Sequence, residues 1–160
     1  MKIYVLCDME GISCLNKMEQ VKREMPEYLE GRELMSEDIN NLVEALFNSG
    51  ATEITVCDTH GGGGNINVSK MNPHAVYEVP NNGKMMPSLD KSYDGLVLFG
   101  HHAKAGTLNG FLDHTMDSSS WYEYSLNGKV MGEIGIESAY AGYFDVPVIM
   151  IQGDETTAQE

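Results

Sequence analysis

The chain has 160 residues, a length that fits one domain with a substantial apolar core. Its hydrophobic content of 42% and charged content of 21% are typical of a globular protein. The formal net charge of -14, from 24 acidic and 10 basic residues, argues against a nucleic-acid partner and favours cations over anions.

The sequence shows neither a recognisable targeting signal nor a pattern of paired cysteines. The sequence has no signal-peptide core after Met1 and no run of about 18 apolar residues, so we expect a cytoplasmic protein without membrane contact. Cys7, Cys14 and Cys57 are odd in number and lack Cys-x-x-Cys spacing. They therefore support neither a disulfide framework nor a structural zinc knuckle, and we expect Cys7 and Cys57 in the core.

The first apolar run, residues 3–7, predicts a buried strand that ends in two acids, Asp8 and Glu10. Positions i and i+2 of a strand point to the same side, so both carboxylates would meet at one place. Their repulsion is costly unless a cation lies between them. We interpret Asp8 and Glu10 as a pair of metal ligands.

A βαβ unit follows. The polar residues 13–27 predict a loop that borders the site, and a helix is predicted from Glu30 or Ser36 to Ser49, with Gly50 just after its end. The apolar residues of this helix recur at the spacing i, i+3, i+4 and i+7: Ile39, Leu42, Val43 and Leu46. Such a crossover is right-handed, with the helix covering a parallel sheet.

Three further apolar runs also end in polar residues that can bind metal. Residues 54–57 precede Asp58 and His60, residues 96–99 precede His101 and His102, and residues 146–151 precede Asp154 and Glu155. The carboxyl ends of parallel strands lie along one edge of a sheet, where ligands bind. We therefore predict an α/β fold over residues 1–160, a single domain whose mainly parallel sheet has flanking helices and a metal site at the C-terminal edge of its strands.

The glycine-rich segment 60–65 leaves several interpretations open. It could be a phosphate cradle or an oxyanion loop, but no G-x-x-x-x-G-K-[ST], G-x-G-x-x-G or G-x-S-x-G motif accompanies it. A flexible loop beside the site is the simpler interpretation. A short strand over residues 75–79 is possible further on.

The second half contains two candidates whose roles the pattern leaves open. His114 lies in a segment without periodicity, so it is either structural or catalytic. Residues 121–126 alternate between apolar and polar side chains like a strand, and Asn127-Gly128 predicts a hairpin turn after them. Residues 130–132 would form the second strand of this hairpin. A helix is predicted from Glu133 through Tyr143. The Glu133 carboxylate at its N-terminus is either stabilised by the helix dipole or binds metal.

Six motifs, taken together and in this order, resemble the D-aminopeptidase DppA family of zinc peptidases over nearly the whole chain. They are Asp8-x-Glu10-Gly11-Ile12, Asp58-x-His60, Gly100-x-His102-Ala103, His114-Thr115-Met116, Gly132-Glu133 and Ala141-Gly142-Tyr143-x-Asp145-Val146-Pro147-Val148. The resemblance implies a dinuclear zinc enzyme that removes N-terminal D-amino acids from short peptides such as D-Ala-D-Ala, in a ring-shaped homo-oligomer. The family also has a further C-terminal portion, which we expect to be missing after Glu160.

Carried over position by position, the resemblance implies five metal ligands and one catalytic residue. The ligands would be Asp8, Glu10, His60, His102 and Glu133, and His114 would act near the scissile bond. The adjacent His101 leaves open which of the two imidazoles binds metal.

The chemistry of this ligand set agrees with zinc. Carboxylates and imidazoles suit Zn²⁺, and no thiolate marks a closed structural site. Asp8 could bridge two ions about 3.5–4 Å apart that activate a water. His114 would then be a general base, a general acid or a nucleophile, and Asp58 would orient His60 or another ligand.

We therefore predict a zinc-dependent aminopeptidase that acts on short peptides with an N-terminal D-residue. One alternative is another dinuclear metallohydrolase, an amidohydrolase or a phosphoesterase. Phosphoesters would require a cationic clamp, and basic residues other than Lys104 are scarce near the motifs. The other alternative is a non-catalytic metal-binding scaffold.

Overall fold

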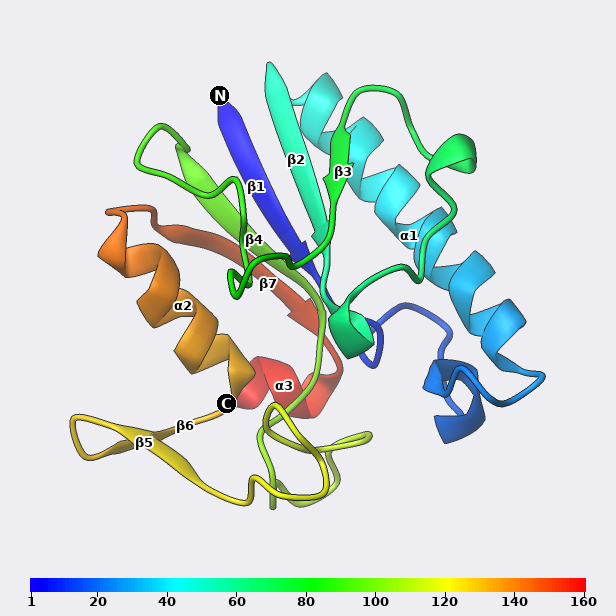
Figure 1. The fold of residues 1–160 in the computed structure, drawn as a ribbon, viewed down its shortest axis with the longest axis vertical. Helices are drawn as coiled ribbons and strands as arrows, with labels where there is room; N and C mark the ends of the chain where they lie inside the picture. The colour runs from blue at the N-terminus through cyan, green and yellow to red at the C-terminus, as the bar shows by residue number, and fades with distance from the viewer.

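In a computed structural model, which describes residues 1–160, five parallel strands form one sheet in the order β3-β2-β1-β4-β7 (Figure 1). These strands are β1 (Lys2–Cys7), β2 (Glu53–Asp58), β3 (Val76–Glu78), β4 (Gly95–His101) and β7 (Val148–Gly153). The helices are α1 (Tyr28–Asn48), α2 (Glu133–Tyr143) and α3 (Glu155–Gln159), and β5 (Tyr124–Leu126) pairs with β6 (Lys129–Met131) as a separate hairpin. The predicted α/β class is confirmed.

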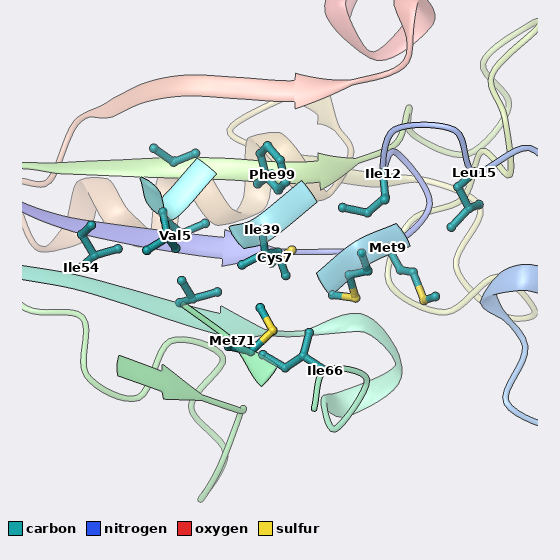
Figure 2. Packing of buried hydrophobic residues seen from close by; sticks show 14 of the residues in the cluster. Val5, Cys7, Met9, Ile12, Leu15, Ile39, Ile54, Ile66, Met71 and Phe99 are labelled. Atoms are coloured by element: carbon teal, nitrogen blue, oxygen red, sulfur yellow. The ribbon is translucent and has the colours of Figure 1, made fainter. Parts of the chain in front are cut away.

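Side-chain alternation along β1 divides the core between the two faces of the sheet. Ile3, Val5 and Cys7 pack in a cluster that contains residues of α1, whereas Tyr4 and Leu6 pack in a second cluster with Ala141 of α2. Figure 2 shows the first cluster, and Figure 1 shows α1 and α2 on opposite sides of the sheet. None of the helices combines the length and the apolar character needed to cross a membrane.

Most predicted elements are present, and the differences lie at their boundaries. The helix α1 starts at Tyr28, before the predicted Glu30 or Ser36, and the predicted loop 13–27 contains a 3-10 turn over Met18–Val21. The strand β7 starts at Val148, after Pro147, which has no N–H group for a ladder. The turn between β5 and β6 has φ values of 52° and 78° at Asn127 and Gly128, as a type I′ hairpin requires.

The C-terminal ends of β1, β4 and β7 converge through three glycines. The Gly11 amide donates to the carbonyl of Gly100 at 2.8 Å, and a Cβ added to Gly11 would lie 2.0 Å from the His101 carbonyl oxygen. Gly100 has a φ of +74°, and its added Cβ would lie 2.3 Å from the backbone carbonyl oxygen of Asp8. A Cβ on Gly153 would also meet the His101 oxygen, at 2.3 Å. Side chains at these positions would force the strand ends apart.

Replacing Gly100 by Ala is expected to destabilise the fold strongly. The positive φ costs a non-glycine residue about 1–2 kcal/mol, and relief of the clash with Asp8 adds about 1–3 kcal/mol. Gly50→Ala is the matched control, because Gly50 also has a positive φ (+94°) but nothing within 4 Å of its added Cβ. Urea unfolding should show a clearly larger loss for Gly100→Ala, and equal losses would contradict the proposed close approach.

Candidate metal centre

Six side chains that can bind metal meet at the C-terminal edge of the sheet. They form two groups, Asp8, Glu10 and His60 in one and His102, His114 and Glu133 in the other, and within each group the ligand atoms lie within 4.8 Å of one another. Both groups lie beside the ends of β1 and β4. The chain leaves β1 toward β2 and β3 on one side and later adds β4 and β7 on the other, so this is the point where the strand order reverses.

His60 connects the two acids that follow β1. Its Nδ1 lies 3.2 Å from Asp8 Oδ1 and 3.1 Å from Glu10 Oε2. Its Nε2 lies 2.9 Å from the Val21 carbonyl oxygen, which can accept only if Nε2 carries the proton. The nitrogen left for a metal ion is therefore Nδ1, the one that faces the carboxylates.

His102 has the same arrangement with its nitrogens exchanged. Its Nδ1 donates to the Ala103 carbonyl at 3.0 Å, and its Nε2 lies 3.4 Å from Asp8 Oδ2 and 3.3 Å from Glu133 Oε1. This Nε2 is buried and has no hydrogen-bond partner. An unpaired buried nitrogen that points between two carboxylates is the expected geometry of a metal ligand.

His114 lies directly over His102. The two rings stack with centroids 3.9 Å apart, and His114 Nδ1 donates to the Leu112 carbonyl at 2.8 Å. Its Nε2 faces Glu133, 3.5 Å from Oε1, and that same oxygen accepts a hydrogen bond from the Met116 amide at 2.7 Å. Leu112 and Met116 both have positive φ, 53° and 60°, which is uncommon for such residues and often accompanies functional sites.

Asp8 joins the two groups. Its Oδ1 faces His60 in the first group, and its Oδ2 faces His102 in the second. This arrangement suits a carboxylate that bridges two cations, and the mixture of carboxylate and imidazole donors suits Zn²⁺. The residues present therefore fit a dinuclear zinc site.

Protons balance the charge of these groups in the metal-free chain. Burial alone would lower the pKa of both imidazoles, but Asp8 and Glu10 raise the pKa of His60 to about 11, and Asp8 and Glu133 raise the pKa of His102 to about 12. Burial alone would raise the pKa of Asp8, but the two imidazoles hold it well below its usual value. A metal cation would replace these protons.

A cavity of about 840 Å³ opens above the two groups. Its lining includes five of the six clustered side chains, Asp8, Glu10, His60, His114 and Glu133, together with the apolar residues Val21, Leu112 and Met116. A volume of this size is typical of ligand sites and accommodates a short peptide.

The two adjacent histidines take different positions. His102 faces Asp8 and Glu133, whereas His101 Nε2 contacts Glu137 Oε2 at 2.5 Å and its Nδ1 lies 3.2 Å from the Phe99 carbonyl oxygen. Both nitrogens of His101 are thus engaged away from the site, so His102 is the imidazole available for metal. The sequence alone had left this choice open.

Asp58, predicted to orient His60 or another ligand, contacts Asn65 and not the His60 ring. Its carboxylate accepts hydrogen bonds from the Asn65 backbone and side-chain amides, both at 2.6 Å. The Asn65 Nδ2 also donates to the His60 carbonyl at 2.7 Å, and Asn65 Oδ1 accepts from Tyr28 and Arg23. Asp58 therefore supports His60 through Asn65 and the glycine loop.

The acids that follow β7 do not join the cluster. Asp154 caps α3, accepting from the Thr157 amide at 2.7 Å and from the Phe111 amide at 3.0 Å, and Glu155 is exposed. Sequence reasoning also missed Asn65 and Glu137. Asn65 ends the glycine-rich loop, where a polar residue carries no distinctive signal, and Glu137 lies one helical turn after Glu133.

Comparisons with known proteins give consistent results. A family model described as D-aminopeptidase matches residues 1–160. A D-aminopeptidase of Bacillus subtilis (strain 168) is 37% identical over 162 residues, which covers 100% of this chain and 58% of that protein. The solved structure of the Zn-dependent D-aminopeptidase DppA from Bacillus subtilis, described as a self-compartmentalizing protease, aligns with a TM-score of 0.93 and 36% identity. It covers 99% of this chain and 58% of that one.

Replacing Asn65 by Ala is expected to lower the free energy of unfolding by about 2–4 kcal/mol, because the buried Asp58 carboxylate would lose a hydrogen-bond donor. Asn65 has 0% exposure, whereas Asn41 on α1 is exposed and serves as the matched control. Urea unfolding of Asn65→Ala and Asn41→Ala measures the difference. A change of less than about 0.5 kcal/mol in both variants, as at ordinary surface sites, would rule out a supporting role for Asn65.

Proposed function

Because this chain belongs to the D-aminopeptidase family, we propose that it is a zinc-dependent aminopeptidase that removes D-amino acids from the N-terminus of short peptides of the D-Ala-D-Ala type. The chain spans 58% of the length of the relatives it matches, so the activity and assembly of the whole protein are part of this proposal.

The observation that carries the proposal is the placement of Asp8 between two groups of ligands. One carboxylate with an oxygen toward His60 and the other toward His102 is costly to bury without cations. Glu10 and Glu133 add one further carboxylate on each side. Asp8, Glu10, His60, His102 and Glu133 would hold two zinc ions, which when bound supply Lewis acidity toward a peptide carbonyl and toward water.

His114 would transfer the proton from the attacking water to the leaving amine. Because its Nδ1–H donates to the Leu112 carbonyl, its Nε2 carries the free lone pair and faces Glu133, which also lines the cavity. Nε2 would accept a proton from the attacking water and return it to the leaving amine. Stacking on His102 and the hydrogen bond to Leu112 keep the ring in this orientation without making it a necessary ligand.

The charge of the cavity favours a peptide over a phosphoester. Its lining contains six acidic side chains, Asp8, Glu10, Asp113, Asp117, Glu133 and Glu137, and Lys22 as its one Lys or Arg. A free N-terminal ammonium is attracted to this lining, whereas a phosphate would need a cationic clamp that the residues do not supply.

We also propose self-association into a ring-shaped homo-oligomer. The related DppA is described as self-compartmentalizing. In this chain Ile149 and Ile151 on the edge strand β7 are 53% and 46% exposed, and Tyr122 before β5 is 78% exposed. Apolar surface on an unpaired strand edge and beside a projecting hairpin supports contacts between subunits.

The metal and catalytic roles are separable by substitution. We expect His60→Ala to lose zinc and activity together, and His114→Ala to keep zinc while its turnover falls about 10²–10⁴-fold. Elemental analysis after zinc loading and dialysis, together with hydrolysis of a D-Ala peptide, measures both properties. His74→Ala, at an exposed histidine on the surface, should change neither. A fully active His114→Ala enzyme would exclude the proposed proton transfer.

The substrate class has its own test. Parallel assays with a D-Ala peptide and an aryl phosphate should give amine release from the peptide and no turnover of the phosphate, because the cavity lacks a cationic clamp. Faster phosphate hydrolysis would favour the phosphoesterase alternative. A chain that retains zinc and hydrolyses neither substrate would favour a metal-binding scaffold.

A further inference from the structure

A second buried pair of histidine and carboxylate lies beside the metal centre. His101 Nε2 contacts Glu137 Oε2 at 2.5 Å, and the two side chains are only 0% and 3% exposed. Neither residue is part of the ligand set. We propose that His101 and Glu137 are a positioning pair that places Glu133 and His102 for zinc binding, an inference that rests on the proposed function.

The pair resembles the contact between His102 and Glu133, displaced by one residue toward the N-terminus on the strand side and by one turn toward the C-terminus of α2. His101 is the last residue of β4 and His102 follows it, and on α2 the two glutamates are four residues apart, which is about one helical turn. His101 meets Glu137, and His102 Nε2 lies 3.3 Å from Glu133 Oε1. The end of β4 and the start of α2 are therefore joined by two neighbouring contacts, of which only the one between His102 and Glu133 would contain metal ligands.

Irregular backbone lets consecutive histidines reach the same helix. Side chains of a regular strand alternate between the two faces of the sheet. Gly100, with its φ of +74°, interrupts that alternation, and the register between β4 and β7 shifts between Leu98 and His101. Both imidazoles can therefore point toward α2.

Apolar contacts also hold α2 against the sheet, through Ala141 and the partly buried Ile134 and Tyr140. The buried residues of α2 are Glu137 and Ala141. The apolar contact of Ala141 has no directional preference, whereas a hydrogen-bonded pair tolerates little change in distance or angle. A shift of α2 by one residue would move Glu133 by about 1.5 Å along the axis and rotate it by about 100°, and it would break the pair with His101. The pair thus adds a directional contact that restricts the rotation and the axial position of the helix that carries Glu133.

The carboxylate of Glu137 is poorly explained by stability alone. A buried ion pair often contributes no more to stability than apolar residues of the same volume, whereas its geometry can specify one arrangement. Both nitrogens of His101 are occupied, by Glu137 and by the Phe99 carbonyl, so this imidazole is unavailable as a ligand. Its effect on zinc would therefore act through the neighbouring residues.

The test measures zinc binding directly, independent of turnover. Metal-free wild type, Glu137→Ala, Glu137→Gln and His101→Ala/Glu137→Ala are titrated with zinc against a chelator, and the d–d absorption of Co²⁺-loaded protein reports the coordination geometry. We expect Glu137→Ala to weaken zinc binding about 10–100-fold and to alter the Co²⁺ spectrum. Glu137→Gln, which keeps an oxygen for His101, should recover most of the affinity.

The double variant should lose no more affinity than Glu137→Ala, because the two residues act as one unit. Glu37→Gln, at an exposed glutamate on α1, is the matched control and should bind zinc like wild type. If Glu137→Ala does not fold, as judged by circular dichroism, His101→Gln replaces it with the same expected loss of affinity.

The outcomes separate this inference from the proposed function. A wild-type chain that takes up no zinc would overturn the proposed function itself. A wild type that binds zinc, together with folded Glu137→Ala or His101→Gln protein of unchanged affinity and Co²⁺ spectrum, would overturn the positioning pair alone.

Discussion

The close approach of β1 and β4 at their C-terminal ends is the constraint on which the site depends. Gly11 and Gly100 leave no room for a Cβ between the two backbones, and the hydrogen bond of 2.8 Å between them continues the contact beyond the strands. Gln152 of β7 reinforces this contact by donating to the Gly11 carbonyl and accepting from the Gly100 amide. The acids after β1 and the imidazole after β4 therefore share one small volume.

Within that volume, backbone carbonyls determine what the imidazoles can do. His60, His102 and His114 each donate one N–H to a carbonyl and turn the other nitrogen toward a carboxylate. The ring orientation and the donating nitrogen are thus decided by the main chain before any metal binds. Such a concentration of buried charge does little for stability, and it is the kind of local conflict that folded proteins retain at functional sites.

Support for the site comes from two different kinds of structure. On the β2 side, a glycine-rich loop is held by Asn65, whose amide connects the buried Asp58 carboxylate to the His60 backbone. On the β4 side, the helix α2 is held by the pair of His101 and Glu137. The loop is held by hydrogen bonds to Asp58 nearby in sequence and to the distant Arg23 and Tyr28, whereas the helix is joined to β4 by a contact across 36 residues.

The amino-acid sequence by itself determined the α/β class, the parallel strands and the candidate ligands at their ends, because short apolar runs that end in acids or histidines are local patterns. It also placed α2 at Glu133–Tyr143 and the turn at Asn127-Gly128. Only the tertiary structure decided that His102 rather than His101 faces the cluster, and that Asp58 acts through Asn65. These choices depend on the irregular backbone at Gly100 and on contacts between residues far apart in the chain, and neither leaves a periodic signal in sequence.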